Sequence, residues 1–162
     1  MDKTSQNIYH DYEKEAKAER HYQMALNCLF MDITNNFTLV IDNLLKAKKI
    51  CPTNKRFHYL LSYCFYKVND NNSLRNEIIL LKELLFDKNI KDIVLKDILS
   101  TKYGKMAERL FEAFNRGGEI GKEAAQGGLH KEYKINYADS SKIFDIYMDF
   151  IKWIEIFEKN FY

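Results

Sequence analysis

The scarcity of helix-breaking residues constrains the fold of this chain most. One proline, Pro52, and six glycines occur in 162 residues, and five of the glycines lie between Gly117 and Gly128. Proline and glycine are the residues that most often interrupt helices, so long uninterrupted segments remain between them. Apolar side chains in those segments recur every three or four positions, which is the spacing of one helix face. The sequence therefore predicts an all-α fold of antiparallel helical hairpins, or a bundle.

About seven helices follow from this periodicity and from residues that favour turns and caps. Short polar side chains accept hydrogen bonds from the free backbone N–H groups that begin a helix. Caps are expected within 34–36, at Ser73, at Ser100 or Thr101, and within 139–141. The helices themselves are predicted over about 5–30, 37–51, 54–68, 74–85, 91–99, 101–117 and, as a long C-terminal helix, 139–161.

A single helical domain over residues 1–162 is expected, because a chain of this length buries a substantial core. Residues 1–17 are weakly apolar and are predicted either to fray or to pack only against a partner. Residues 117–138 are predicted to form a glycine-rich connection around a short helix at 119–126. The fourth helix carries a wide apolar stripe that includes Ile79, which predicts a central position packed on two sides.

The cysteines and the chain start indicate a cytoplasmic protein. Cys28, Cys51 and Cys64 are odd in number and not closely paired, which is typical of reduced thiols. Met1 is followed by a polar run rather than an apolar signal core. The most apolar stretch, 143–157, contains four charged residues, so no membrane span is expected.

The segment from Ala47 to Leu74 reads as a helix end, a turn at Pro52, and an amphipathic helix that ends at Asn69 and Asp70. Its residues carry a pattern that resembles the junction between two tetratricopeptide repeats. The pattern comprises Ala47, Ile50, Pro52, Asn54, Leu61, Ser62, Cys64, Phe65, Tyr66, Asn69 and Asp70. The resemblance covers about one repeat. It implies stacked hairpins whose concave surface binds proteins and is lined by the first helix of each hairpin, here 54–68.

Within that helix the less apolar face offers candidate partner-binding residues. They are Lys55, Arg56, His58, Tyr59, Ser62 and Tyr66. Between Asp42 and Asp70 all charged residues are cations, although the whole chain carries a formal charge of only +2. These cations either favour the negative end of a helix dipole or form a shallow patch for an acidic partner.

A second candidate surface lies on the C-terminal helix. Its apolar positions repeat in steps of four and three, a seam suited to another helix. The residues proposed for it are Tyr147, Phe150, Trp153 and Phe157. This face packs either in the chain's own core or against a target or second copy, which would make a homodimer.

No catalytic residue, metal ligand or cofactor is predicted. The segment 116–122 combines glycines with cations, but three residues separate Gly117 from Gly121 where a phosphate-binding P-loop has four, and Glu123 replaces the required Ser or Thr. His21 would lie about 12 Å beyond Glu13 along one helix, so a single ion cannot bind His10, Glu13 and His21 together. No Arg and His have the spacing of helical HEPN-type ribonucleases, with which the chain shares only a general helical architecture.

These observations predict a non-catalytic helical adaptor, chaperone or inhibitor that binds another protein or an acidic peptide. Two alternatives remain open. A helical nuclease or nucleotide-handling enzyme would need side chains that only folding brings together. A nucleic-acid-binding regulator would use the cations from Lys46 to Arg56, although the small net charge makes nucleic acid the less favoured partner.

Overall fold

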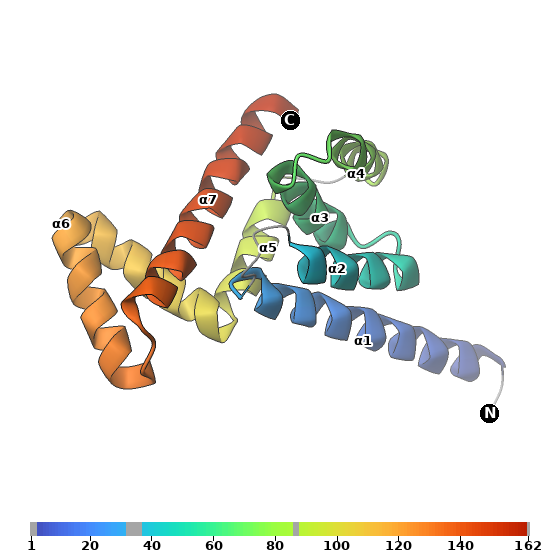
Figure 1. Ribbon diagram of the computed structural model, residues 1–162. Coiled ribbons are helices and arrows are strands. Elements are labelled where there is room, and N and C mark those ends of the chain that lie inside the picture. The colour runs from blue at the N-terminus through green and yellow to red at the C-terminus, as the bar shows by residue number, and fades with distance from the viewer. Residues whose placement is uncertain (1–2, 32–36, 86–87, 162) are drawn as a thin grey trace. The chain divides into compact units, whose positions relative to one another are not determined.

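The computed structural model describes residues 3–31, 37–85 and 88–161, which form seven helices and no strand (Figure 1). The predicted all-α class and long C-terminal helix are confirmed. In chain order the helices are α1 (Lys3–Leu29), α2 (Thr38–Ile50), α3 (Lys55–Lys67), α4 (Asn71–Glu83), α5 (Ile90–Leu99), α6 (Lys102–Tyr133) and α7 (Tyr137–Phe161).

The chain divides into two compact units, Met1–Val94 and Leu95–Tyr162, and the division falls within α5. The expectation of one domain over residues 1–162 and the fraying of residues 1–17 stay predictions, although α1 is helical from Lys3 onward. Among the helices described, none combines the length and apolar character that a bilayer crossing requires.

Two successive helical hairpins build the N-terminal unit. The helix α1 packs on α2, α2 on α3, and α3 on α4. Figure 1 shows α1 and α2 running side by side in opposite directions. Large side chains fill the core; the rings of Tyr22 and Phe57, for example, lie 5.2 Å apart between α1 and α3. Tyr22, Leu26, Leu44, Leu60 and Leu61 are fully buried.

The caps of these helices differ in part from the predicted ones. Asp70, rather than Ser73, caps α4: its carboxylate accepts from the Ser73 backbone N–H at 3.2 Å and from the Ser73 hydroxyl at 2.7 Å. Ser73 lies three residues inside the helix because the chain already turns at Asp70. The cap predicted within 34–36 lies outside the described residues, and Phe37, which precedes α2, makes no side-chain cap bond.

The predicted central position of α4 is wrong. Of its residues only Glu77, Ile78 and Leu81 are buried, whereas Ile79 is 47% exposed. The main packing partner of α4 is α3, and the other apolar residues of the helix are only partly buried or exposed.

In the C-terminal unit, α6 and α7 pack against each other. Thr101 caps α6, one of the two caps predicted there, and its hydroxyl accepts from the Gly104 backbone N–H at 3.0 Å. The segment 117–138 is helical as far as Tyr133, with one non-helical residue at Gly118 that divides α6 into two arms. Where a glycine-rich connection was predicted over 117–138, the structure has only a short link before α7, where Asn136 accepts from the Asp139 N–H.

Candidate functional site

Three of the residues predicted to face a partner from α3 are buried. His58 is 1% exposed, and Tyr59 and Ser62 are completely covered. The exposed face proposed for these three residues is therefore wrong, because α2 and α4 both pack on α3 and enclose its polar positions. Tyr66, at 39% exposure, remains on the surface near the end of the helix.

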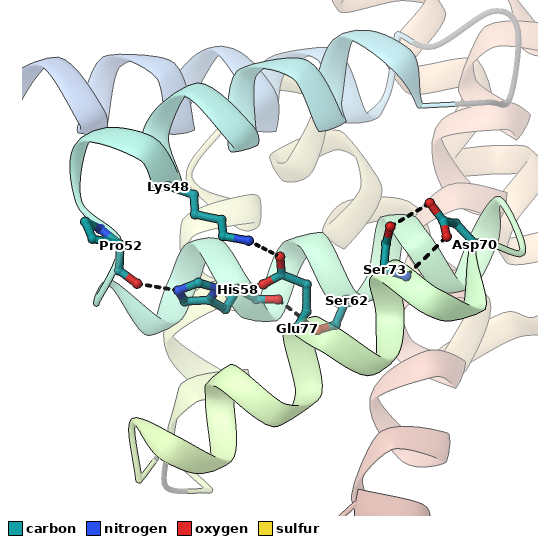
Figure 2. A network of polar contacts seen from close by, with 7 residues as sticks. All are labelled: Lys48, Pro52, His58, Ser62, Asp70, Ser73 and Glu77. Carbon is teal, nitrogen blue, oxygen red and sulfur yellow. Dashed lines mark hydrogen bonds and ion pairs between the residues drawn. The ribbon is translucent and has the colours of Figure 1, made fainter.

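The buried polar residues of α3 belong to a network that joins three helices (Figure 2). Glu77 of α4 lies 2.6 Å from the Lys48 ammonium of α2 and 2.6 Å from Nδ1 of His58. The other ring nitrogen of His58, Nε2, lies 2.6 Å from the Pro52 carbonyl oxygen. The Ser62 hydroxyl donates to the His58 carbonyl at 2.8 Å.

This geometry uses both nitrogens of the His58 ring. Each nitrogen faces an oxygen acceptor, so Nε2 carries a hydrogen for the Pro52 carbonyl, and a proton lies between Nδ1 and Glu77. Neither nitrogen has a lone pair free for a metal ion or for proton abstraction from a substrate. We therefore assign the network a structural role, as a buried tie among α2, α3 and α4.

Arg56, another predicted partner-binding residue, is engaged inside the N-terminal unit. Its guanidinium forms an ion pair of 2.5 Å with Glu19 of α1 and lies 4.7 Å from the centre of the Tyr22 ring. Burial raises the pKa of Glu19, but hydrogen bonds from Arg56 and Gln23 and the Arg56 charge outweigh it, so the pKa is lowered. Lys55 donates to the Leu85 carbonyl at 3.4 Å.

The aromatic face proposed on α7 is buried as well. Tyr147 is 4% exposed and meets Phe111 of α6 with ring centres 5.3 Å apart. Phe150, Trp153 and Phe157 are each at most 2% exposed, and their rings contact one another along the helix. The burial of these four side chains agrees with the first interpretation, packing in the chain's own core. It leaves none of the four exposed for contact with a second molecule.

A cleft of about 870 Å³ between α1 and α2 brings together residues that are far apart in the sequence. We call it the lysine groove. One face of α1 contributes Glu13, Lys14, Lys17 and His21, which recur at helical spacing, and α2 contributes Lys46, Lys49 and Ile50.

The charge of the lysine groove is mostly not neutralised by the protein. Lys46 lies 3.2 Å from Asp42, one turn earlier on the same helix, and both are more than half exposed. Lys14, Lys17 and Lys49 make no ion pair with any side chain in the described part of the chain. The groove is thus lined by four lysines and one glutamate, which gives it a positive potential.

His21 adds a polar atom to the wall of the groove. Its Nδ1 is buried and has no hydrogen-bond partner among the described residues. Sequence analysis identified Lys46 and Lys49 within a cationic run, but missed Lys14, Lys17 and His21 as their neighbours. The available signal was the repetition of cations on one face of a weakly apolar helix.

A second cleft, of about 510 Å³, lies between α1 and the turn after α2, and it is less suited to a charged ligand. Glu19 and Arg56, which line it, already neutralise each other. Cys51 also lines it, and burial followed by the charge of Glu15 raises the pKa of this thiol, which lowers its reactivity.

The residues considered for catalysis or metal binding do not converge where the structure describes them. His130 lies 2.9 Å from the Ile135 carbonyl and stacks on Tyr137, whereas Arg116 contacts Glu112 on its own helix. The side chain of His10 lies outside the described residues. Among the side chains described, no three His, Cys, Asp or Glu residues form a group able to hold a metal ion. Comparisons with protein-family models, curated proteins and solved structures give no match to this chain.

Proposed function

We propose that this chain is a non-catalytic, cytoplasmic protein-binding module, an adaptor, chaperone or inhibitor, whose lysine groove binds an acidic segment of another protein. The observation that carries the proposal is the convergence of Lys14, Lys17, Lys46 and Lys49 on one cleft between two packed helices. Successive hairpins α1–α2 and α3–α4 resemble helical-repeat modules in general arrangement, which supports a binding role.

Lysine chemistry favours a ligand with several loosely positioned carboxylates. Each ammonium is a compact charge on a flexible stem, so it follows a carboxylate without demanding one fixed geometry. An exposed pair contributes about 0.2–1 kcal/mol, so four pairs supply roughly 1–4 kcal/mol. Micromolar binding requires about 8 kcal/mol, so a natural partner must also make apolar contacts, for which Ile50 is available.

Fluorescence anisotropy with a labelled peptide rich in Asp, Glu and Leu tests the groove directly. The test variant is Lys14→Glu combined with Lys49→Glu. The control is Lys105→Glu combined with Lys152→Glu, which reverses two exposed lysines outside the groove. We expect the groove variant to weaken binding at least about tenfold, and the control to change it less than about twofold.

Two results would reject the groove as the binding site. One is equal weakening by both variants, which would reflect total charge alone. The other is undiminished binding of a peptide in which every Asp and Glu is replaced by its amide, because the ammonium groups would then have no role.

A nucleic-acid-binding regulator is the second candidate, favoured by the same four lysines because phosphates also attract them. The groove contains no arginine, the usual residue for bidentate recognition of phosphate and bases, and it includes Glu13. Competition by single-stranded RNA separates the candidates. Displacement of the acidic peptide at equal or lower RNA phosphate concentration would favour the regulator.

A further inference from the structure

The bend in α6 depends on a single residue. Gly118 has φ 62° and ψ −148°, and it is the one non-helical residue inside the helix Lys102–Tyr133. This region of backbone space is open essentially to glycine. Figure 1 shows the two arms of α6 running in different directions from this point.

The bent form also requires glycine at a second position. A β-carbon on Gly121 would lie 2.4 Å from the Ala113 carbonyl oxygen, so the two arms approach too closely there for any other residue. In a straight helix, residues 113 and 121 are about 12 Å apart along the axis. Within one chain this close approach therefore exists only while α6 is bent at Gly118, and it adds a steric requirement for glycine at position 121.

The bend lets α7 pack on both arms of α6. Phe111 and Phe114 of the first arm meet Tyr147 and Phe144 of α7, with ring centres 5.3 and 5.4 Å apart. Lys122 of the second arm lies 4.9 Å from the centre of the Phe144 ring. If α6 straightened, the second arm would carry α7 away and uncover the aromatic residues of the first arm.

We infer that Gly118 is a hinge at which α6 straightens, and that two copies of this chain then exchange residues 119–162. In the exchanged dimer, Phe144 and Tyr147 of each copy pack on Phe114 and Phe111 of the other. The partner is a second copy because its second arm and its α7 offer the same residues to the first arm, including Glu132 for the ion pair with Arg109. Exchange would also allow the C-terminal helix to take part in self-association, although its aromatic face is buried within the single chain.

The balance between the two forms rests mainly on the hinge residues, because the aromatic contacts are the same in both. Glycine at position 118 accepts the bend and is a poor helix former, so it favours the bent monomer. Alanine at position 118 disfavours the bend and favours a continuous helix. Alanine at position 121 acts through a separate cause. Within one bent chain the short link at Gly118 holds the two arms where this β-carbon collides with the Ala113 carbonyl, whereas arms that belong to two chains can move apart.

Size-exclusion chromatography with light scattering on the full chain tests the hinge. We expect Gly118→Ala and Gly121→Ala each to raise the dimer association constant by at least about tenfold, with helix content unchanged by circular dichroism. Gly117→Ala is the matched control. A β-carbon on Gly117 would have no neighbour within 4 Å, and this residue keeps an ordinary φ, so alanine there is helical in both forms.

Exchange also predicts slow kinetics, because the dimer must open α6–α7 packing before it separates. After dilution, we expect the Gly118→Ala dimer to persist for minutes or longer and to dissociate faster as denaturant is added. Three results would each overturn the inference. The first is that Gly118→Ala and Gly121→Ala both remain monomers. The second is that Gly117→Ala dimerises equally, and the third is a dimer that dissociates immediately on dilution.

Discussion

At the scale of single residues, partners distant in the sequence decide what a side chain does. Arg56 looked available for an acidic ligand, yet Glu19 and the ring of Tyr22 hold its guanidinium. Both partners lie on α1, more than thirty residues earlier, and periodicity says nothing about which charge meets which. The result is a tie between α1 and α3 that combines an ion pair with a cation–π contact.

The lowered pKa of Glu19 gives this tie a pH dependence. Burial alone would raise the pKa, but the hydrogen bonds from Arg56 and Gln23 and the Arg56 charge lower it below the ordinary 4.5. The carboxylate therefore stabilises the fold above that value, and the stabilisation is lost as pH falls through the lower folded-state pKa. We expect Glu19→Gln to reduce the unfolding free energy by about 0.5–1 kcal/mol at neutral pH, because the pair is partly exposed and screened.

Urea unfolding measured from neutral pH to about pH 2 checks this, since the difference between Glu19→Gln and the parent chain should vanish at the acid end. Glu83→Gln, an exposed position on α4, is the control and should follow the parent at every pH. A constant difference down to the lowest pH would show that the carboxylate charge is not the cause.

At the scale of helices, the sequence predicted the features that depend on neighbouring residues, such as caps and helix ends. The Thr101 cap and the ends of α3 follow from neighbouring residues, and they are observed. The fate of the glycine-rich segment was not predictable, because glycine permits both a turn and a helix. Gly128, for example, stays helical within α6, where a β-carbon would lie 3.2 Å from the Arg109 guanidinium. The lysine groove was equally invisible, because α1 and α2 become neighbours only in the fold.

The buried tie between α3 and α4 gives a prediction at this scale. Removing Glu77 would leave Lys48 and His58 without their shared acceptor. We expect Glu77→Ala to lower the unfolding free energy by about 1–3 kcal/mol, because the buried His58 ring would lose a hydrogen-bond partner whereas the Lys48 side chain is 28% exposed and water can reach it. Glu77→Gln should cost less, because its amide donates to Nδ1 of a neutral His58 ring while its oxygen accepts from Lys48.

Chemical unfolding of the two variants beside Glu83→Ala, an exposed change on the same helix, measures these costs. The control should remain within about 0.5 kcal/mol of the parent. Equal losses for Glu77→Ala and Glu77→Gln would mean that the hydrogen bonds of Glu77 do not hold the two helices together.

At the scale of the whole molecule, the cation excess belongs to one unit. Residues 1–94 contain fourteen basic and twelve acidic residues, whereas residues 95–162 contain eleven of each. The formal charge of +2 is therefore carried entirely by the unit that forms the lysine groove. A small net charge conceals this concentration, because charge totals do not record position.

Binding of the acidic peptide should accordingly depend on salt. Raising NaCl from about 0.1 to about 1 M shortens the screening length from about 10 to about 3 Å, so we expect the affinity to fall roughly tenfold. The variant Lys14→Glu with Lys49→Glu should lose most of this dependence, whereas Lys105→Glu with Lys152→Glu should keep it. A salt-independent affinity of the parent chain would indicate that apolar contacts alone hold the peptide.

The network of Lys48, His58 and Glu77 also predicts a pattern that can be sought in the sequences of homologues. Its three members are separated by nine and eighteen residues, while the Pro52 carbonyl is a backbone group that any residue supplies. Distant homologues should therefore retain a basic residue, a histidine and an acidic residue at these intervals, even where other positions have diverged. Lineages that lose the acid should have replaced the imidazole too, so paired substitution at these columns would indicate that the two side chains depend on each other.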